Sequence, residues 1–182
     1  DENFSRYSPV PGYPALRNAI VAKLKNENNL EYTAAQISCS NGAKQSVCNV
    51  IMALVGEGDE VIVPAPYWVS YPEMVKLADG TPVIVSAGIE QDFKITPEQL
   101  EGAITPKTKM LVMPFPCNPT GGTMDRRDLE AIAEVLRGTD IMVLSDEIYA
   151  ELTYGQRHVS MANITDMYER TIVVNGFSKS HA

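Results

Sequence analysis

The chain has 182 residues, 45% of them hydrophobic, and its 23 acidic side chains outnumber its 15 basic ones, which gives a formal net charge of −8. Binding to a nucleic-acid backbone needs a positive face, so this acidic balance argues against DNA and RNA as partners. No apolar run approaches the roughly 20 residues that cross a membrane, and the first residues do not resemble a signal peptide. We therefore expect a soluble, cytoplasmic protein with a substantial core.

The cysteines and histidines do not form a metal pattern. Cys39, Cys48 and Cys117 lack the paired spacing of a zinc site or a disulfide framework. We expect reduced thiols that pack as small apolar residues. His158 and His181 also lie outside any recognisable metal motif. The sequence therefore predicts no metal site.

The first predicted element is a helix that begins at Pro14, where the missing amide hydrogen costs nothing. Leu16, Ile20 and Leu24 follow at helical spacing. A second helix is predicted to begin near Gly42, because apolar residues recur after it at every third or fourth position. No repeat or linker interrupts the chain, which favours one continuous domain.

Short apolar runs then alternate with segments of helical length. The runs are rich in Val, Ile, Leu and Met at successive positions, as in strands that are covered on both faces. Predicted strands are residues 60–63, 82–86, 109–113, 141–144 and 171–175, and predicted helices are residues 67–78, 96–104 and 125–137. This alternation predicts an α/β fold with a mostly parallel sheet and helices on both faces. The strand order cannot be derived from it.

Polar and aromatic residues follow four of the predicted strands. They are Trp68, Asn118, Asp146 with Tyr149, and Lys179. In open α/β sheets, ligands bind beyond the carboxyl ends of the strands. We therefore expect these side chains to converge on one ligand.

This set of side chains suits a pyridine aldehyde with a phosphate arm. Lys179 can form an imine with the aldehyde, and Asp146 can lie beside the ring nitrogen. Asn118 and Tyr149 can donate to the phenolic oxygen, while Trp68 can stack on the ring. We expect contact with the charged ring to favour the ionised form of Asp146.

A turn of small residues at the start of the second predicted helix can hold the phosphate. Gly42, Ala43 and Lys44 lie there, where backbone amides have no partner within the helix. The helix dipole favours an anion at this end by about 0.3–1 kcal/mol.

Five motifs in this order carry a resemblance. They are Ser-Asn-Gly-Ala-Lys-Gln at 40–45, Pro-Ala-Pro-Tyr-Trp at 64–68, Asn-Pro-Thr-Gly at 118–121, Ser-Asp-Glu-Ile-Tyr at 145–149 and Phe-Ser-Lys at 177–179. Together they resemble the class I aminotransferases of pyridoxal-phosphate fold type I, and more narrowly the bacterial aspartate aminotransferases. The resemblance is co-linear over nearly the whole chain.

The resemblance implies a role for each site residue. Lys179, Asp146 and Tyr149 are expected to be catalytic, with Lys179 as the Schiff-base lysine of pyridoxal 5'-phosphate and Asp146 as the partner of its ring nitrogen. Trp68 and Asn118 are expected to contact both cofactor and substrate. The remaining implied cofactor contacts are Gly42, Ala43, Lys44 and Tyr7, the last reaching the phosphate in the neighbouring subunit of a homodimer.

The resemblance also implies a reaction and a place in a longer protein. The expected reaction moves an amino group from an L-amino acid, aspartate in the first instance, to a 2-oxo acid such as 2-oxoglutarate. Residues 1–182 are expected to be part of the cofactor-binding large domain, without an N-terminal segment and a C-terminal small domain. Many relatives have Ser where this chain has Gly176, and the resemblance then suggests Ser178 as a substitute phosphate contact.

Alternatives to this assignment remain open on the sequence. A C–S β-lyase or a decarboxylase uses the same cofactor and the same residues. A non-catalytic α/β domain that binds another phosphorylated ligand is a third possibility. Each residue also has an ordinary explanation: Asp146 as a helix cap, Asn118 as a turn former and Trp68 as core, with Tyr67 as a rival for the stacking role.

Overall fold

The computed structural model describes residue 5 and residues 7–181. Contacts group the chain into two compact units, Asp1–Asn41 and Gly42–Ala182. This differs from the single continuous domain that the sequence predicts, because no linker in the sequence separates the two units. Among the described residues, no helix is both long enough and apolar enough to cross a membrane.

The N-terminal unit contains helix α1 (Pro14–Asn28) and the short 3₁₀ helix η1 (Ala34–Gln36). Pro14 occupies the first turn, as predicted, and α1 ends at Asn29 in the left-handed conformation. The Arg17 guanidinium donates to the Ile37 carbonyl at 3.0 Å, which ties α1 to the segment after η1. Of the predicted apolar stripe only Leu24 is buried, and Leu16 remains 40% exposed.

The second unit is built on a five-stranded sheet in which every pairing is parallel. Its order is β2-β1-β3-β4-β5. The strands are β1 (Glu60–Ala65), β2 (Thr81–Ser86), β3 (Thr108–Met113), β4 (Met142–Asp146) and β5 (Thr171–Val174). All five predicted strands are present, so the predicted α/β fold with a mostly parallel sheet is confirmed.

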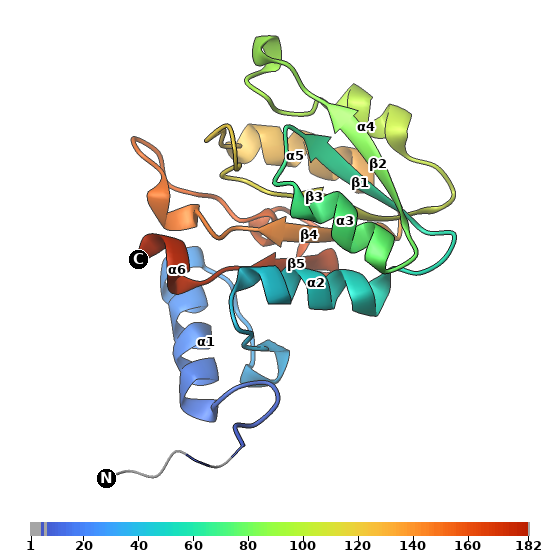
Figure 1. Cartoon of the computed structure of the whole chain (residues 1–182). Coiled ribbons are helices and arrows are strands. Elements are labelled where there is room, and N and C mark those ends of the chain that lie inside the picture. Colours follow the sequence, from blue (N-terminus) through green and yellow to red (C-terminus); the bar gives the residue numbers. More distant parts are fainter. Residues whose placement is uncertain (1–4, 6, 182) are drawn as a thin grey trace. The chain divides into compact units, whose positions relative to one another are not determined.

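Helices cover both faces of the sheet (Figure 1). The helices of this unit are α2 (Ala43–Leu54), α3 (Ser70–Leu77), α4 (Pro97–Ala103), α5 (Arg126–Leu136) and α6 (Phe177–Ser180). One core joins α2 and α3 to the sheet, and a second joins α4 and α5 to the opposite face. Short 3₁₀ helices are η2 (Ile89–Gln91), η3 (Ala150–Leu152), η4 (Met161–Asn163) and η5 (Tyr168–Arg170).

Local sequence explains where the covering helices begin. The Thr96 hydroxyl accepts from the Gln99 amide at the start of α4, and the Asp125 carboxylate accepts from the Asp128 amide at the start of α5. Each of these side chains satisfies a helix amide that has no partner in the first turn. The predicted helices 96–104 and 125–137 agree with α4 and α5 to within a few residues.

Strand β2 differs from the prediction that the strands are covered on both faces. It lies at the edge of the sheet, and each of its residues is exposed or half-buried, with Ile84 42% exposed. An apolar run cannot show whether its strand is central or at an edge, because that depends on its neighbours. The central strands β1 and β3 are buried along most of their length, as predicted.

Candidate active site

A cavity of about 390 Å³ lies at the carboxyl ends of the strands, and its volume is in the range of small-ligand pockets. The parallel pairing brings all five strand ends to this edge of the sheet. Eight of the nine predicted site residues line the cavity: Gly42, Ala43, Lys44, Trp68, Asn118, Asp146, Tyr149 and Lys179. The predicted convergence of these side chains is therefore present in the structure.

Asp146 is the last residue of β4 and only 5% of it is exposed. Its Oδ2 accepts from the Tyr71 hydroxyl at 2.6 Å, and its Oδ1 accepts from the Ile148 amide at 3.2 Å. Burial raises the pKa of the Asp146 carboxyl above its ordinary value, and these two hydrogen bonds oppose that shift. Both donors are neutral, so neither supplies the positive charge that a buried carboxylate favours.

Tyr71 is the main site residue that the sequence reasoning missed. It lies on α3, lines the cavity and packs edge-on against Trp68 with ring centroids 5.3 Å apart. Burial, followed by the neighbouring Asp146, raises the pKa of its phenol well above the ordinary value. The phenol therefore keeps its proton and can donate it in the hydrogen bond to Asp146. The available signal was the spacing of three residues between Trp68 and Tyr71 within the predicted helix 67–78, since residues three apart share one face of a helix, although α3 begins only at Ser70.

Lys179 and Tyr149 reach the cavity from different segments. Lys179 lies on the short helix α6 after β5, and Tyr149 lies in the turn after β4. The Lys179 Nζ is 5.8 Å from the centroid of the Tyr149 ring. The amine is exposed and faces an aromatic side chain, so a ligand in the cavity can reach it.

Trp68 provides the aromatic surface of the cavity. The Lys44 Nζ lies over its ring, 5.1 Å from the centroid. Tyr67, the rival candidate, packs against the core between the sheet and helices α2 and α3 and is not among the cavity residues. The structure therefore favours Trp68 as the residue that can stack on a ligand.

The N-terminus of α2 forms another part of the cavity lining. Gly42 precedes the helix with a φ of +91°, and a Cβ added there would have no neighbour within 4 Å. The backbone hydrogen bonds of the helix begin with the Gln45 and Ser46 amides, which both donate to the Gly42 carbonyl. The amides of Ala43 and Lys44 thus precede the helical ladder, in a position that suits an anion.

Asn118 is held by a closed turn. The Cys117 amide donates to the Gly122 carbonyl and the Gly121 amide donates to the Cys117 carbonyl, both at 2.8 Å. The peptide bond between Asn118 and Pro119 is cis. Asn118 is thereby both a turn former and a cavity residue. Ser178, which is suggested as a phosphate contact in place of the missing Ser at position 176, also lines the cavity.

Tyr7 is the ninth predicted residue. It belongs to the N-terminal unit, its side chain is fully exposed, and it is not among the cavity residues. Its predicted contact is with a neighbouring subunit, so that role stays a prediction.

The donor set fits pyridoxal phosphate. An amine, a buried carboxylate without a cationic partner, a phenol, an amide and an indole face one cavity, and helix amides lie at its edge. Two lysines against one aspartate leave the lining positive on balance, which suits an anion. The residues present could therefore hold the group at each of its polar positions.

The model of the family described as aminotransferase class I and II matches residues 1–182. The chain belongs to this family. It is 47% identical to the aspartate aminotransferase of Bacillus subtilis and 49% identical to a bifunctional aspartate and glutamate/aspartate-prephenate aminotransferase of Petunia hybrida. The whole chain is covered in both cases, against 47% and 38% of these two relatives, so it spans less than half of their length.

Solved structures of family members have the same fold. An aspartate aminotransferase from Rhizobium meliloti matches with a TM-score of 0.93 at 38% identity, over 96% of this chain and 44% of that one. The aromatic aminotransferase of Pyrococcus horikoshii matches with a TM-score of 0.93 at 41% identity, over 96% of this chain and 48% of that one. These matches confirm the predicted large-domain fold of the fold type I enzymes.

Proposed function

We propose that the protein containing this chain is a pyridoxal-phosphate-dependent aminotransferase that moves an amino group from aspartate to a 2-oxo acid such as 2-oxoglutarate. The observation that carries the proposal is the meeting of Lys179, Asp146 and Tyr149 in one cavity at the carboxyl edge of the sheet. Membership of the aminotransferase family and the names of its relatives support the reaction and the amino acid.

Each polar group of the cavity has a task in this proposal. When bound, pyridoxal phosphate supplies an aldehyde that accepts the amino group and a ring that takes up the electrons of a broken Cα–H bond. Asp146 holds its negative charge beside the ring nitrogen and favours a proton there. The Tyr71 hydroxyl and the Ile148 amide hold that carboxylate in place.

Lys179 acts through its Nζ. An ordinary lysine has a pKa near 10.4 and is almost wholly protonated at pH 7, so the free amine is a poor nucleophile. With pyridoxal phosphate bound, Nζ would hold it through a covalent bond, which would remove this difficulty. The same amine, when free, would take the α-proton from the substrate and return it at the cofactor.

The other residues bind and orient. Asn118 and Tyr149 donate to the phenolic oxygen of the cofactor, and Trp68 packs on its ring. The amides of Gly42, Ala43 and Lys44 hold the phosphate at the N-terminus of α2. Trp68 and Asn118 also contact the substrate in this proposal.

Further parts of the proposal concern the whole protein. The chain is proposed to be part of a cofactor-binding large domain, because the residues that could hold the cofactor lie on it. A homodimer, with Tyr7 reaching the partner's phosphate, and a cytoplasmic location are also proposed. The proposed partners are small molecules, an amino acid and a 2-oxo acid, rather than nucleic acid or membrane.

The site is tested by locating the covalent bond. The intact protein is incubated with pyridoxal phosphate, reduced with borohydride, digested and mapped by mass spectrometry. We expect the label on Lys179. A label on another lysine, or none, overturns the proposed site.

The reaction is tested by its products. Incubation with aspartate and 2-oxoglutarate should yield oxaloacetate and glutamate. Release of ammonia would indicate a lyase instead, and release of carbon dioxide from Cα would indicate a decarboxylase.

A further inference from the structure

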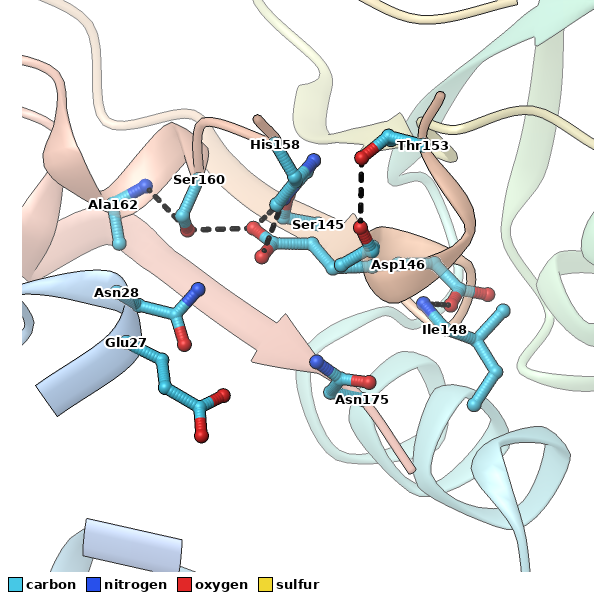
Figure 2. A network of polar contacts seen from close by, with 12 residues as sticks. Glu27, Asn28, Ser145, Asp146, Ile148, Thr153, His158, Ser160, Ala162 and Asn175 are labelled. Atoms are coloured by element: carbon cyan, nitrogen blue, oxygen red, sulfur yellow. Dashed lines mark hydrogen bonds and ion pairs between the residues drawn. The ribbon is translucent and has the colours of Figure 1, made fainter. Parts of the chain in front are cut away.

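A second carboxylate is buried directly behind Asp146. Glu147 is 1% exposed and its side chain has three partners. Its Oε1 accepts from the Ser160 hydroxyl at 2.6 Å and from the Ser145 hydroxyl at 3.0 Å, and its Oε2 lies 2.9 Å from His158 Nε2. In Figure 2, Ser145, His158 and Ser160 lie close to one another, and dashed lines mark the contacts of the network. No residue of this network lines the cavity, so the proposed reaction does not use it directly.

The arrangement is not that of a nucleophilic triad. Both serine hydroxyls donate to the carboxylate, and neither is hydrogen-bonded to the imidazole. A triad needs the serine to be hydrogen-bonded to the base. Among the described residues there is also no cluster of three His, Cys, Asp or Glu side chains that could hold a metal ion. The network therefore holds side chains in place: the Glu147 carboxylate contacts two serine hydroxyls and one imidazole.

The network joins three separate segments at the edge where the cavity lies. Ser145 belongs to β4, and His158 and Ser160 belong to the segment that leads into η4. The Glu147 amide donates to the Val174 carbonyl at the end of β5, at 2.8 Å. Glu147 thereby fixes the chain at the point where it leaves the sheet.

The residues on either side of Glu147 carry the proposed chemistry. Asp146 precedes it, and the Ile148 amide that donates to Asp146 follows it. The Ala150 amide donates to the Glu147 carbonyl at 2.9 Å, which closes the turn that carries Tyr149. A displacement of Glu147 therefore moves Asp146 and Tyr149 together.

Burying this carboxylate has a cost, which indicates that something offsets it. A buried charge is expensive unless it is paired and hydrogen-bonded, and its replacement by apolar residues is often neutral or stabilising. The Glu147 charge is also among the influences that raise the pKa of Asp146, although burial is the largest. A role in holding the neighbouring cavity residues in a fixed orientation is consistent with a buried carboxylate at this position.

We infer that Glu147, held by Ser145, His158 and Ser160, is a positioning residue that orients Asp146 and Tyr149 toward the bound cofactor. The inference rests on the proposed function, because it assigns a task to residues behind that site. It predicts that loss of the network weakens cofactor binding beyond any loss of stability.

The test measures affinity for pyridoxal phosphate in the intact protein. Trp68 is the single tryptophan of these 182 residues and lines the cavity, so quenching of its fluorescence reports on binding. Variants are Glu147→Ala, which deletes the network, Glu147→Gln, which keeps its shape and one acceptor oxygen, and Ser160→Ala, which removes one donor. Leu129→Ala in α5 is the control, because it truncates a buried core residue that is not in the network.

We expect Glu147→Ala to weaken binding on the order of tenfold or more, the loss typical of removing a group that orients a ligand-binding side chain. Ser160→Ala should weaken it less, and Glu147→Gln should restore most of the affinity. Leu129→Ala should lower the midpoint of thermal unfolding but leave the affinity unchanged at temperatures where it is folded. The absorbance maximum of the bound cofactor should shift in Glu147→Ala and not in Leu129→Ala.

The outcomes separate the two proposals. If the wild-type protein does not bind pyridoxal phosphate, the proposed function fails, and the inference fails with it. If the wild type binds and Glu147→Ala and Ser160→Ala bind equally well while folded, the inference alone is overturned. Should Glu147→Ala fail to fold, Ser160→Ala with its smaller change decides the matter by the same comparison.

Discussion

The two ends of the parallel sheet use polar side chains in different ways. At the amino ends, polar groups pair locally and near the surface: the Thr105 hydroxyl donates to Glu60 at 2.5 Å, and the Gly56 amide donates to Asp59 at 3.0 Å. At the carboxyl ends, Asp146 and Glu147 are buried, and Asp146 faces a cavity.

This difference separates polar groups that close loops from polar groups that serve a ligand. A surface pair contributes little to stability, and its loss is easily tolerated. A buried carboxylate with only neutral donors costs stability, so its presence beside a cavity points to a ligand that places a positively charged group next to it. Substitutions at the carboxyl ends should therefore change binding, whereas those at the amino ends should change stability at most.

The largest expected effect is at Lys179. Lys179→Ala removes the amine that carries the cofactor and moves the proton, so we expect a loss of the aminotransfer rate of about 10²–10⁴-fold or more. Because the side chain is exposed, the unfolding free energy should change little. Lys76→Ala is the control, since Lys76 is an exposed lysine of α3 that pairs with Glu73. Wild-type turnover in Lys179→Ala would contradict the assignment.

The next effect is at Tyr71. Tyr71→Phe removes a buried donor from a carboxylate but keeps the ring that packs on Trp68. We expect the unfolding free energy to fall by about 1.5–3 kcal/mol, measured by urea unfolding, and the affinity for pyridoxal phosphate to fall as well. Tyr154→Phe, on an exposed side chain, should change neither. Unaltered stability and affinity in Tyr71→Phe would mean that this hydrogen bond does not support the site.

Two glycines sharpen the comparison of the two ends. Gly42 lies at the cavity and has a φ of +91°. Gly56 lies at the amino ends of the strands, and its φ is not in the positive range that favours glycine. A Cβ added at either position would have no neighbour within 4 Å. Gly42→Ala should cost about 1–2 kcal/mol of unfolding free energy, because only the backbone conformation opposes it. Gly56→Ala should be neutral or stabilising. Equal effects at both positions would show that the left-handed conformation is not required at Gly42.

A smaller effect concerns pH. The folded pKa of Asp146 lies above its unfolded value of about 3.8, so between the two values the folded protein binds more protons than the unfolded chain. Its contribution to stability is therefore present below about pH 3.8 and is lost as the pH rises through the folded pKa. Without cofactor, the unfolding free energy of the wild type should fall relative to that of Asp146→Asn as the pH rises from 4 to 7.

Asp125 gives the opposite sign in the same experiment. The hydrogen bond from the Asp128 amide lowers the pKa of this exposed N-cap carboxyl. Its contribution is present above the unfolded pKa and is lost as the pH falls through the folded one. The unfolding free energy of Asp125→Asn should therefore fall behind that of the wild type as the pH rises toward about 3.8 from below, so this variant is also measured below pH 4. The same trend in both variants would refute the burial argument for Asp146.

Much of the site could be predicted because its motifs are local. Each predicted residue that lines the cavity follows a strand or begins a helix, and parallel strands bring their carboxyl ends to one edge. Tyr71 and the partners of Glu147 could not be found in this way. The contact between Tyr71 and Asp146 joins residues 75 positions apart, and His158 meets Glu147 across a loop. No local pattern marks such contacts.

The sequence by itself determined the alternation of strands and helices, the helix that begins at Pro14 and the five motifs, because these depend on patterns within a few residues. The tertiary structure alone decided the strand order, the exposed edge position of β2, the raised pKa of Asp146 and the network around Glu147. Those features depend on which distant segments pack together, and burial by distant segments sets both the exposure of a strand and the charge of a carboxylate.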